Sequence, residues 1–257
     1  MTRTANAAGL ERFSLSGRIV LVTGSTRGLG LAMAGGMAAG GAVVGVNGRD
    51  ADRAPEIAKS IPNAFAASFD ITHLDVATVV IDELVARHGR LDCLVNNAAV
   101  RDRRTLEDIT PGDFRRLIET NLVSQYALSR VAVRHMAARG GGRLLFISSM
   151  VGPQSFQGDP AYMASKGGLE ALMRALAVEL GGKGIGANAI APGFFATEGN
   201  APFFGEPRIA EVPRCISPGR YGRPAELVAA AIFLASDAAS YITGQVLTVD
   251  AGLSIAL

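Results

Sequence analysis

The sequence predicts one α/β domain built on a doubly wound parallel sheet, with helices covering both faces. Three observations lead to this fold class. Short aliphatic runs alternate with longer amphipathic or alanine-rich runs, as they do in βαβ units. The first run, Ile19-Val20-Leu21-Val22, is continuously apolar, which is typical of a strand buried on both faces. A glycine-rich turn follows this run directly, and a helical pattern follows the turn.

The predicted elements follow one another along the whole chain. Strands are expected at 19–23, 43–46, 64–68, 91–96, 143–148, 186–190 and 246–249. Helices are expected at 28–39, 51–59, 76–88, 111–139, 161–180 and 224–235. No internal repeat or low-complexity linker interrupts this order. Residues 15–257 are therefore interpreted as a single domain, and residues 1–14 as an N-terminal extension.

One long stretch, from Pro192 to Arg223, interrupts the alternation of strands and helices. It carries five prolines, and loops of this length inside a compact domain are usually functional. We therefore expect a substrate lid at about 193–223. A disordered insertion is the alternative. Four phenylalanines favour a segment that packs against the domain: Phe194, Phe195, Phe203 and Phe204.

Composition and charge argue against several classes of protein. Hydrophobic residues make up 49% of the chain and charged residues 19%, so a large core can be buried. The formal net charge is +2 and the basic residues are scattered, which argues against nucleic acid as a partner. No run approaches 18 apolar residues and the opening segment lacks a signal-peptide core, so we expect no membrane span and a cytoplasmic location. The two cysteines and three histidines lack metal-ligand spacing, so no metal site is expected.

The turn after the first strand reads Thr23-Gly24-Ser25-Thr26-Arg27-Gly28-Leu29-Gly30. Glycines here let the backbone approach a pyrophosphate, and the helix that follows offers unpaired N–H groups to it. Glycine clusters often serve only a tight turn, but this one stands between a strand and a helix. That arrangement is typical of a Rossmann-type dinucleotide site. We therefore predict that residues 24–30 bind a dinucleotide.

The choice of dinucleotide depends on the charges near the second strand. An NAD site places an acid at the end of this strand, where it accepts a hydrogen bond from the ribose 2′-hydroxyl. Here the strand ends in Asn47-Gly48-Arg49, and we interpret the first acid, Asp50, as a cap for the next helix. Arg49 and Arg27 favour a 2′-phosphate, so NADP(H) is expected in preference to NAD(H). The alternative is that both arginines are solvated surface residues.

A tyrosine and a lysine four residues apart are the candidate catalytic pair. With four tyrosines and three lysines in the chain, random placement gives one Tyr-x-x-x-Lys with a probability of about 0.05. On a helix, Tyr162 and Lys166 share a face, so the ammonium group would bring the tyrosine pKa toward neutral. Ser149 ends the fifth predicted strand at the carboxyl edge of the sheet, where its hydroxyl can stabilise charge on a substrate oxygen. Ser148 is the competing serine.

Taken together, these motifs resemble the short-chain dehydrogenase/reductase family from about residue 15 to residue 253. The glycine spacing is TGxxxGxG, the sequence NNAA follows the fourth strand, and Ser149, Tyr162 and Lys166 stand in the family's order. The family's spacing to the tyrosine selects Ser149 over Ser148. The resemblance implies an NAD(P)-dependent oxidoreductase that interconverts a secondary alcohol and a ketone. Ala99 and Ala251 stand where the family usually has glycine, at positions that carry no chemistry.

The resemblance also implies roles that the spacing alone does not assign. Asn121 would hold a water that connects the lysine to solvent and supports proton resupply. Asp70 and Ile71 would contact the adenine, although Asp70 could equally cap the next helix. The family commonly forms tetramers, so a homotetramer is expected. The other implied cofactor contacts are Asn97, Ala98, Tyr162, Lys166, Pro192, Gly193 and Thr197.

Three stretches, 47–50, 100–104 and 192–198, resemble the gluconate 5-dehydrogenase branch, which acts on sugar acids with NADP(H). Arg103 or Arg104 could pair with the substrate carboxylate, and a solvated loop is the alternative. A 3-oxoacyl-thioester reductase is the first alternative function, because an apolar lid suits an acyl chain and Arg139 and Lys183 could dock a carrier protein. A catalytically idle NADP-binding protein is the second. The expected substrate contacts are Ser149, Tyr162, Arg103 and Phe194.

Overall fold

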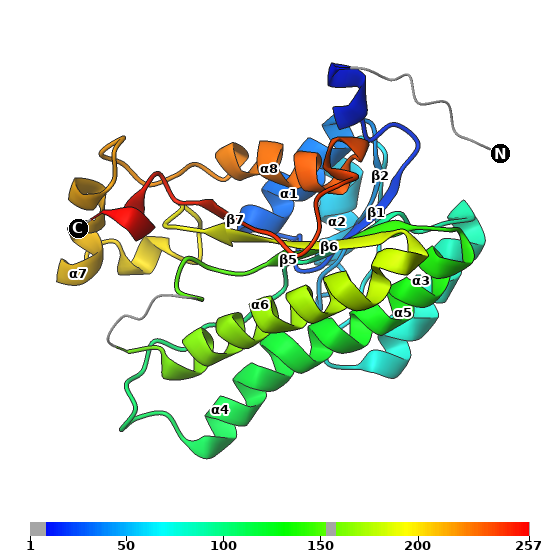
Figure 1. Ribbon diagram of the computed structural model, residues 1–257. Helices are drawn as coiled ribbons and strands as arrows, with labels where there is room; N and C mark the ends of the chain where they lie inside the picture. Colours follow the sequence, from blue (N-terminus) through cyan, green and yellow to red (C-terminus); the bar gives the residue numbers. More distant parts are fainter. Residues whose placement is uncertain (1–8, 153–157, 257) are drawn as a thin grey trace.

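Within residues 9–152 and 158–256, which the computed structural model describes, seven parallel strands form one sheet (Figure 1). The strand order is β3-β2-β1-β4-β5-β6-β7, so the direction of travel reverses between β1 and β4. Ligands of open α/β sheets bind beyond the carboxyl ends of the strands at such a reversal. The strands are β1 (Ile19–Val22), β2 (Val43–Val46), β3 (Ala64–Ala66), β4 (Cys93–Asn96), β5 (Gly142–Ile147), β6 (Ile185–Pro192) and β7 (Val246–Val249).

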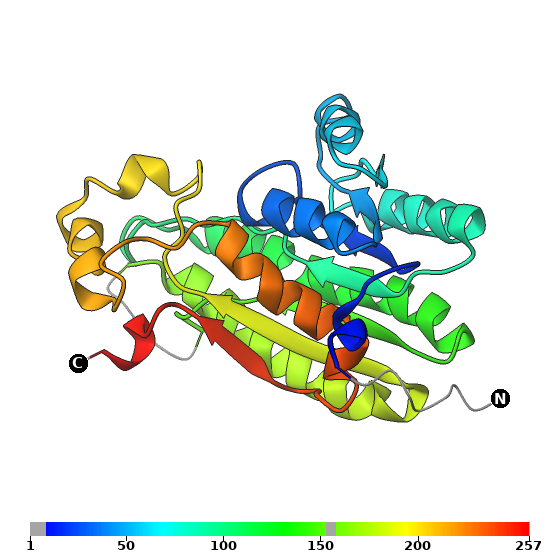
Figure 2. The same ribbon diagram turned by 90° about the horizontal axis from the view of Figure 1, so that it is seen from above.

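Helices cover both faces of the sheet, as Figures 1 and 2 show. One face packs against α1 (Gly28–Ala39), α2 (Arg53–Ser60) and α8 (Ala225–Ala235). The other packs against α3 (Leu74–His88), α5 (Ser124–Ala138) and α6 (Pro160–Leu180). No helix in the described ranges is long and apolar enough to cross a membrane. The predicted fold class is therefore confirmed, and most predicted boundaries lie within two residues of the observed ones.

The first strand shows how one apolar run serves two cores. Ile19 and Leu21 contribute to the core on the α3, α5 and α6 side, whereas Val20 and Val22 contribute to the core on the α1 and α8 side. Successive strand residues point to opposite faces, and here both faces are covered. All four residues are buried, so the absence of polar alternation in this run has a direct structural cause.

The predicted helix at 111–139 is not continuous. It consists of α4 (Pro111–Ile118), a π-helical segment at Glu119–Val123, and α5. A capping box between Thr110 and Asp113 begins α4. At the π-helical segment, both the backbone N–H and the hydroxyl of Ser124 donate to the carbonyl oxygen of Glu119, five residues back. Such wide turns inside α-helices are frequent at functional sites.

The stretch after β6 packs against the domain, as its phenylalanines indicated. Phe195 is buried, and the ring of Phe204 stacks on Tyr221 with 4.2 Å between the ring centroids. Short helical turns at Ala201–Phe203, α7 (Pro207–Ala210) and Val212–Cys215 make up much of the segment. We use the word lid for residues 193–223.

Part of the predicted N-terminal extension also packs against the domain. Residues 1–8 lie outside the described residues. Beyond them, Phe13 stacks on Phe233 of α8, with ring centroids 5.8 Å apart. Arg12 donates to the carbonyl oxygen of Asp237 at 2.8 Å and to the hydroxyl of Ser240 at 2.7 Å. Residues 9–14 are thus attached far from the carboxyl edge of the sheet (Figure 1).

Candidate active site

The glycine turn lies at the reversal of strand order, between β1 and α1. Gly24 and Gly28 adopt φ angles of +61° and +57°, which side chains other than glycine rarely adopt. A Cβ on Gly30 would lie 2.3 Å from the carbonyl oxygen of Gly24, so only glycine fits there. Arg27, the residue before α1, makes no side-chain cap. The first N–H groups of α1 are therefore left to a ligand, and an anionic phosphate suits them.

Ser25 and Asn47 shape this turn with buried side chains. The Ser25 hydroxyl donates to the carbonyl oxygen of Val22 at 2.7 Å and accepts from the backbone N–H of Asn47 at 2.9 Å. The Asn47 amide oxygen accepts from the backbone N–H of Gly24 at 3.0 Å. Both side chains are at most 1% exposed. Their contribution to dinucleotide binding is therefore to hold the backbone of the turn in place.

Residues after β4 close the other side of the turn. The Asn97 side chain donates to the carbonyl oxygens of Thr23 at 2.8 Å and Gly24 at 3.0 Å. The backbone N–H groups of Asn97 and Ala98 both donate to the Thr23 hydroxyl. A Cβ on Gly24 would lie 2.8 Å from the Cα of Ala98, which explains why glycine is needed at that position.

Two arginines flank the turn on its exposed side. Arg27 is exposed, and so is Arg49, whose guanidinium lies 3.9 Å from the carboxylate of Asp70. Asp70 also accepts from the backbone and hydroxyl of Thr72, at 2.9 and 2.8 Å, just before α3. Asp50 accepts from the backbone N–H groups that open α2, as expected for a cap, and these bonds lower its pKa. Both acids are therefore engaged with backbone N–H groups close to them in the sequence.

The catalytic candidates meet where β5 ends and α6 begins. Ser149 follows β5, and its hydroxyl faces the phenol of Tyr162 on the first turn of α6, where it lowers the pKa of that phenol. Lys166, one turn further along α6, is 1% exposed and donates to the carbonyl oxygen of Ile147 at 2.7 Å. Its ammonium nitrogen lies 5.6 Å from the centre of the Tyr162 ring. The predicted trio therefore forms one contiguous group.

The electrostatics of this group differ from the simple pair expected from the sequence. Burial lowers the pKa of Lys166 to about 7, and nearby Glu170 only partly opposes this shift. Burial raises the pKa of Tyr162, whereas the Arg101 guanidinium and the Ser149 hydrogen bond lower it. The net direction for Tyr162 is upward, opposite to the direction expected from Lys166 alone. The cations that lower the pKa of Tyr162 are Arg101 and Arg103.

The structure separates the two competing serines. Ser148 is buried, and its hydroxyl donates to the carboxylate of Glu170 at 2.7 Å. Glu170 is itself 5% exposed and lies 3.7 Å from the guanidinium of Arg174. Ser148 is thus committed to linking β5 to α6, and Ser149 is the serine that meets Tyr162.

Asn121 occupies the π-helical segment and connects two parts of the site. Its side chain is fully buried, accepts from the backbone N–H of Val100 at 2.8 Å and donates to the carbonyl oxygen of Val100 at 2.8 Å. It also donates to the Ser165 hydroxyl at 3.1 Å, and Ser165 donates to the carbonyl oxygen of Tyr162. Asn121 therefore holds the loop after β4 against the catalytic helix.

On the substrate side, Arg103 is the arginine with unused donors. Its Nη2 donates to the amide oxygen of Asn200 at 3.1 Å, and its guanidinium lies 3.9 Å over the ring of Phe203. Its Nε and Nη1 are buried and have no hydrogen-bond partner among the described residues. Burial lowers the pKa of this guanidinium. Buried donors without partners are costly, so a ligand acceptor at this position would be strongly favoured.

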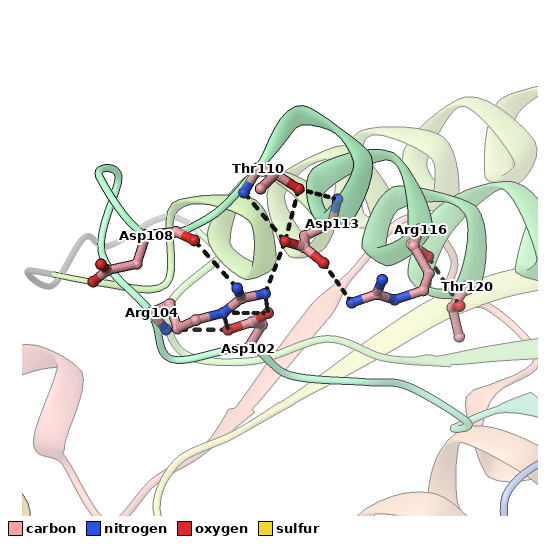
Figure 3. Close-up of polar contacts among 7 residues, drawn as sticks. All are labelled: Asp102, Arg104, Asp108, Thr110, Asp113, Arg116 and Thr120. Carbon is pink, nitrogen blue, oxygen red and sulfur yellow. Dashed lines mark hydrogen bonds and ion pairs between the residues drawn. The ribbon is translucent and has the colours of Figure 1, made fainter.

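Arg104, the neighbouring candidate, is engaged elsewhere, as Figure 3 shows. It hydrogen-bonds Asp102 at 2.9 Å and the carbonyl oxygen of Asp108 at 3.2 Å, and it forms an ion pair with Asp113 at 3.0 Å. Asp113 also caps α4, and its hydrogen bonds with Thr110 hold its pKa well below the usual range. Arg104 thus attaches the loop after β4 to the start of α4, and Arg103 remains the candidate for the substrate.

Two residues next to Tyr162 were not predicted to act at the site. Arg101 lies 4.9 Å over the centre of the Tyr162 ring, and its Nε donates to the carboxylate of Asp159 at 2.6 Å. Asp159 is 5% exposed and adopts a φ angle of +60° at the start of α6. The sequence carries a weak signal for Asp159, since an acid before Pro160 suggests a helix start, but nothing in it indicates the pairing with Arg101.

The lid begins beside the cofactor turn. The Thr197 side chain lies 3.8 Å from where a Cβ on Gly28 would be, so the predicted nicotinamide contact does adjoin the turn. Pro192 accepts from the backbone N–H of Met150, and Gly193 donates to the carbonyl oxygen of Val249. Phe194 lines a cavity of about 130 Å³ together with residues of the lid and the β7 end, a set that does not include the catalytic candidates.

Comparisons with known proteins were made for the whole chain. Residues 24–254 match the family model described as enoyl-(acyl carrier protein) reductase. Gluconate 5-dehydrogenase from Gluconobacter oxydans (strain 621H) is 35% identical over 252 residues, which cover 96% of this chain and 98% of that protein. 3-Oxoacyl-[acyl-carrier-protein] reductase from Salmonella typhimurium is 35% identical over 244 residues, which cover 93% of this chain and 98% of that protein. A solved gluconate 5-dehydrogenase from Burkholderia cenocepacia J2315, in complex with NADP and tartrate, has a TM-score of 0.92 and 36% identity, with 96% of this chain and 98% of that chain covered.

Proposed function

This chain belongs to the short-chain dehydrogenase/reductase family, and we propose that it interconverts a secondary alcohol and a ketone of a sugar acid with NADP(H). The observation that carries the proposal is the contiguous group of Ser149, Tyr162 and Lys166, with the unused donors of Arg103 on the adjoining loop. The relatives include gluconate 5-dehydrogenases, one of them solved with NADP and tartrate. Tartrate is a hydroxy acid, and a carboxylate of this class could bind the guanidinium of Arg103.

The cofactor site fits a phosphorylated dinucleotide. Gly24, Gly28 and Gly30 leave no side chains over the turn, and the uncapped N-terminus of α1 suits a pyrophosphate. Arg27 and Arg49 are exposed beside the turn, where they can bind a 2′-phosphate. Asp70, Ile71, Asn97, Ala98 and Thr197 remain the proposed contacts along the rest of the dinucleotide, and NAD(H) is the alternative cofactor.

Each catalytic residue has a distinct task in the proposed mechanism. When bound, NADPH supplies a hydride to the carbonyl carbon of the substrate. Tyr162 donates its phenolic proton to the carbonyl oxygen, and the Ser149 hydroxyl orients that oxygen and stabilises its developing charge. Lys166 stabilises the phenolate that remains and binds ribose hydroxyls. Asn121, through its bonds to the Val100 backbone and Ser165, keeps the route for reprotonation in place. In oxidation each step is reversed.

Arg103 is proposed to select the substrate class by binding its carboxylate. A charge-assisted hydrogen bond contributes roughly 1.5–3 kcal/mol, or about 10- to 100-fold in affinity. Arg103→Gln is therefore expected to raise the KM for D-gluconate at least about tenfold and to change kcat little. Arg116→Gln removes an exposed guanidinium whose ion pair, within the described part of the chain, is with Asp113, and it serves as the matched control.

The 3-oxoacyl-thioester alternative receives less support from the lid. Its phenylalanines pack against other lid residues or Arg103: Phe204 stacks on Tyr221, Phe195 is buried and Phe203 lies on the guanidinium. An acyl chain would have to displace these contacts. Arg139 and Lys183, the expected docking cations, are both exposed.

A nicotinamide absorbance assay tests the proposal. The purified chain should oxidise D-gluconate with NADP⁺ and reduce 5-ketogluconate with NADPH. Faster reduction of an acetoacetyl thioester than of 5-ketogluconate would favour the alternative. Turnover of none of the three would favour the idle NADP-binding protein, and either result would overturn the sugar-acid assignment.

We also infer that the protein acts as a cytoplasmic homotetramer. The π-helical segment, α5 and α6 expose apolar side chains, with Val123 42%, Tyr126 43% and Val178 86% exposed. Apolar side chains exposed in this way suit burial against a second copy. Sedimentation of a monomer at micromolar concentration would contradict the inference.

A further inference from the structure

Arg101 and Asp159 stand beside the catalytic tyrosine, and the proposed mechanism uses neither. Arg101 comes from the loop after β4, and Asp159 stands immediately before the first residue of α6. The Arg101 guanidinium lies 4.9 Å over the centre of the Tyr162 ring. Its Nε donates to Asp159 at 2.6 Å, and a second guanidinium nitrogen forms an ion pair with the same carboxylate oxygen. The cation is thus held over the ring rather than free in solvent.

The loop that carries Arg101 is itself attached on both sides. The backbone N–H of Asp159 donates to the carbonyl oxygen of Arg104 at 3.4 Å, so the loop and the start of α6 are in direct contact. On the other side, Arg104 binds Asp113 of α4 (Figure 3). Asp159 is 5% exposed, and its second carboxylate oxygen, Oδ1, is buried and has no partner among the described residues. Within the described residues, the carboxylate is therefore bound through Oδ2, which pairs with Arg101.

Several charged or polar groups face Tyr162. Lys166 lies on its own helix, Ser149 at the end of β5, Arg101 and Arg103 on the loop after β4. Asp159, three residues before the tyrosine, is the acid in this set. Arg101 lowers the pKa of Tyr162, whereas Asp159 raises it in the same direction as burial does. The two members of the ion pair therefore act on the phenol in opposite directions.

We propose that Arg101 is a positioning residue that favours the phenolate form of Tyr162, with Asp159 holding it in place and limiting its effect. The proposal rests on the proposed role of Tyr162 as the acid/base. A guanidinium keeps its charge throughout the working pH range, whereas a buried lysine can lose its proton. Arg101 therefore supplies a positive charge beside the phenol at pH values where Lys166 is partly neutral.

Two substitutions with opposite expected signs test this proposal. Arg101→Gln removes the cation, so the pH at which D-gluconate oxidation reaches half its maximal kcat/KM should rise by about one unit. Asp159→Asn removes the negative charge but keeps an acceptor for Arg101, so the same midpoint should fall. Arg101→Lys, which keeps the charge, should remain within a few tenths of a unit of the unchanged chain. A purely structural pair would lower the rate without moving the midpoints in opposite directions.

A titration without substrate provides a second measurement. Tyrosinate absorbance of each chain minus that of its Tyr162→Phe counterpart reports the ionisation of Tyr162 alone, and it should show the same two shifts. An Arg101→Gln midpoint equal to that of the unchanged chain, or shifts of both variants in one direction, would overturn the proposal. Full activity of Tyr162→Phe would instead overturn the proposed function, so the two failures are distinguishable.

Discussion

The two sides of the active site satisfy their polar groups differently. On the cofactor side, hydrogen bonds link side chains at the ends of β1, β2 and β4 to one another and to the backbone. The residues that form them are Thr23, Ser25, Asn47 and Asn97. On the substrate side, Arg103 retains two buried donors without partners among the described residues.

This difference indicates what each side recognises. The side chains that shape the glycine turn are already hydrogen-bonded, so the turn offers a ligand only backbone N–H groups and open space. These suit the pyrophosphate of a dinucleotide, which many enzymes bind. Side chains that still need partners discriminate between ligands, because a ligand that cannot pair with them leaves a buried group unsatisfied. We therefore expect cofactor binding to depend mainly on backbone groups, and the choice of substrate to depend on side chains that lack partners.

The largest expected effect lies between the two sides, at the acid/base. Tyr162→Phe removes the transferable proton and should reduce kcat about 10³-fold, while the Kd for NADPH changes less than twofold. Steady-state rates and fluorescence titration with NADPH measure the two quantities. Tyr241→Phe, at a fully exposed tyrosine, is the matched control. A residual kcat above about one-tenth of the original would contradict the role of Tyr162 as the catalytic acid/base.

On the cofactor side, Gly30→Ala should disrupt the glycine turn, because the neighbouring atoms leave no space for a methyl group. The new Cβ would lie 2.3 Å from the Gly24 carbonyl oxygen and 2.5 Å from the Asn97 amide nitrogen. We expect a loss of about 2 kcal/mol in the free energy of unfolding and weaker NADPH binding. Gly35→Ala in the same helix meets no atom within 4 Å and should stabilise the chain slightly. Equal effects of the two substitutions in urea denaturation would show that packing at the turn is unimportant.

Lys166 gives a pH-dependent test of the buried site. Its pKa is about 7 in the folded chain and about 10.4 in an unfolded one, so the unfolded state binds more protons between these values. Stability from this group therefore increases as pH rises from 7 toward 10, and below pH 7 the buried ammonium lowers stability. Lys166→Met should stabilise the cofactor-free chain more at pH 6 than at pH 9, by on the order of 2 kcal/mol. Urea denaturation at pH 6 and pH 9 measures the difference in unfolding free energy between Lys166→Met and the unchanged chain. The same difference at both pH values would contradict this expectation.

The smallest expected effect concerns the exposed edge of the cofactor side. Arg49→Gln should raise the Kd for NADPH about five- to tenfold and leave the Kd for NADH nearly unchanged, because only the former carries the 2′-phosphate. Arg53→Gln, which removes an arginine paired with Glu56 on α2, is the control. An equal loss of affinity for both dinucleotides would mean that Arg49 does not bind the 2′-phosphate.

Local sequence patterns predicted most of the fold, because strand burial and helix periodicity are properties of consecutive residues. The continuously apolar Ile19–Val22 indicated a strand covered on both faces, and both faces are covered. The interruption at Glu119–Val123 was missed, because bonds spanning five residues there depend on where Asn121 and Ser124 are held. The spacing of apolar and polar residues along the sequence does not indicate such a turn.

The candidate site likewise has features that local sequence indicates and features that only the folded chain decides. The glycine turn, Tyr162 and Lys166 could be identified from spacing alone, since a tight turn and a shared helix face are local geometry. The family's spacing to Tyr162 selected Ser149 over Ser148, and in the structure Ser148 is bound to Glu170, 22 residues further along the chain. Only the tertiary structure distinguished Arg103 from Arg104, because Arg104 is engaged by Asp102 and Asp113. The same applies to Arg101 and Asp159, which are 58 residues apart and meet over the tyrosine. The sequence by itself indicated the reaction type, because its motifs are local, whereas the pairing of charged and polar side chains in the folded chain decided which of them keep unpaired donors.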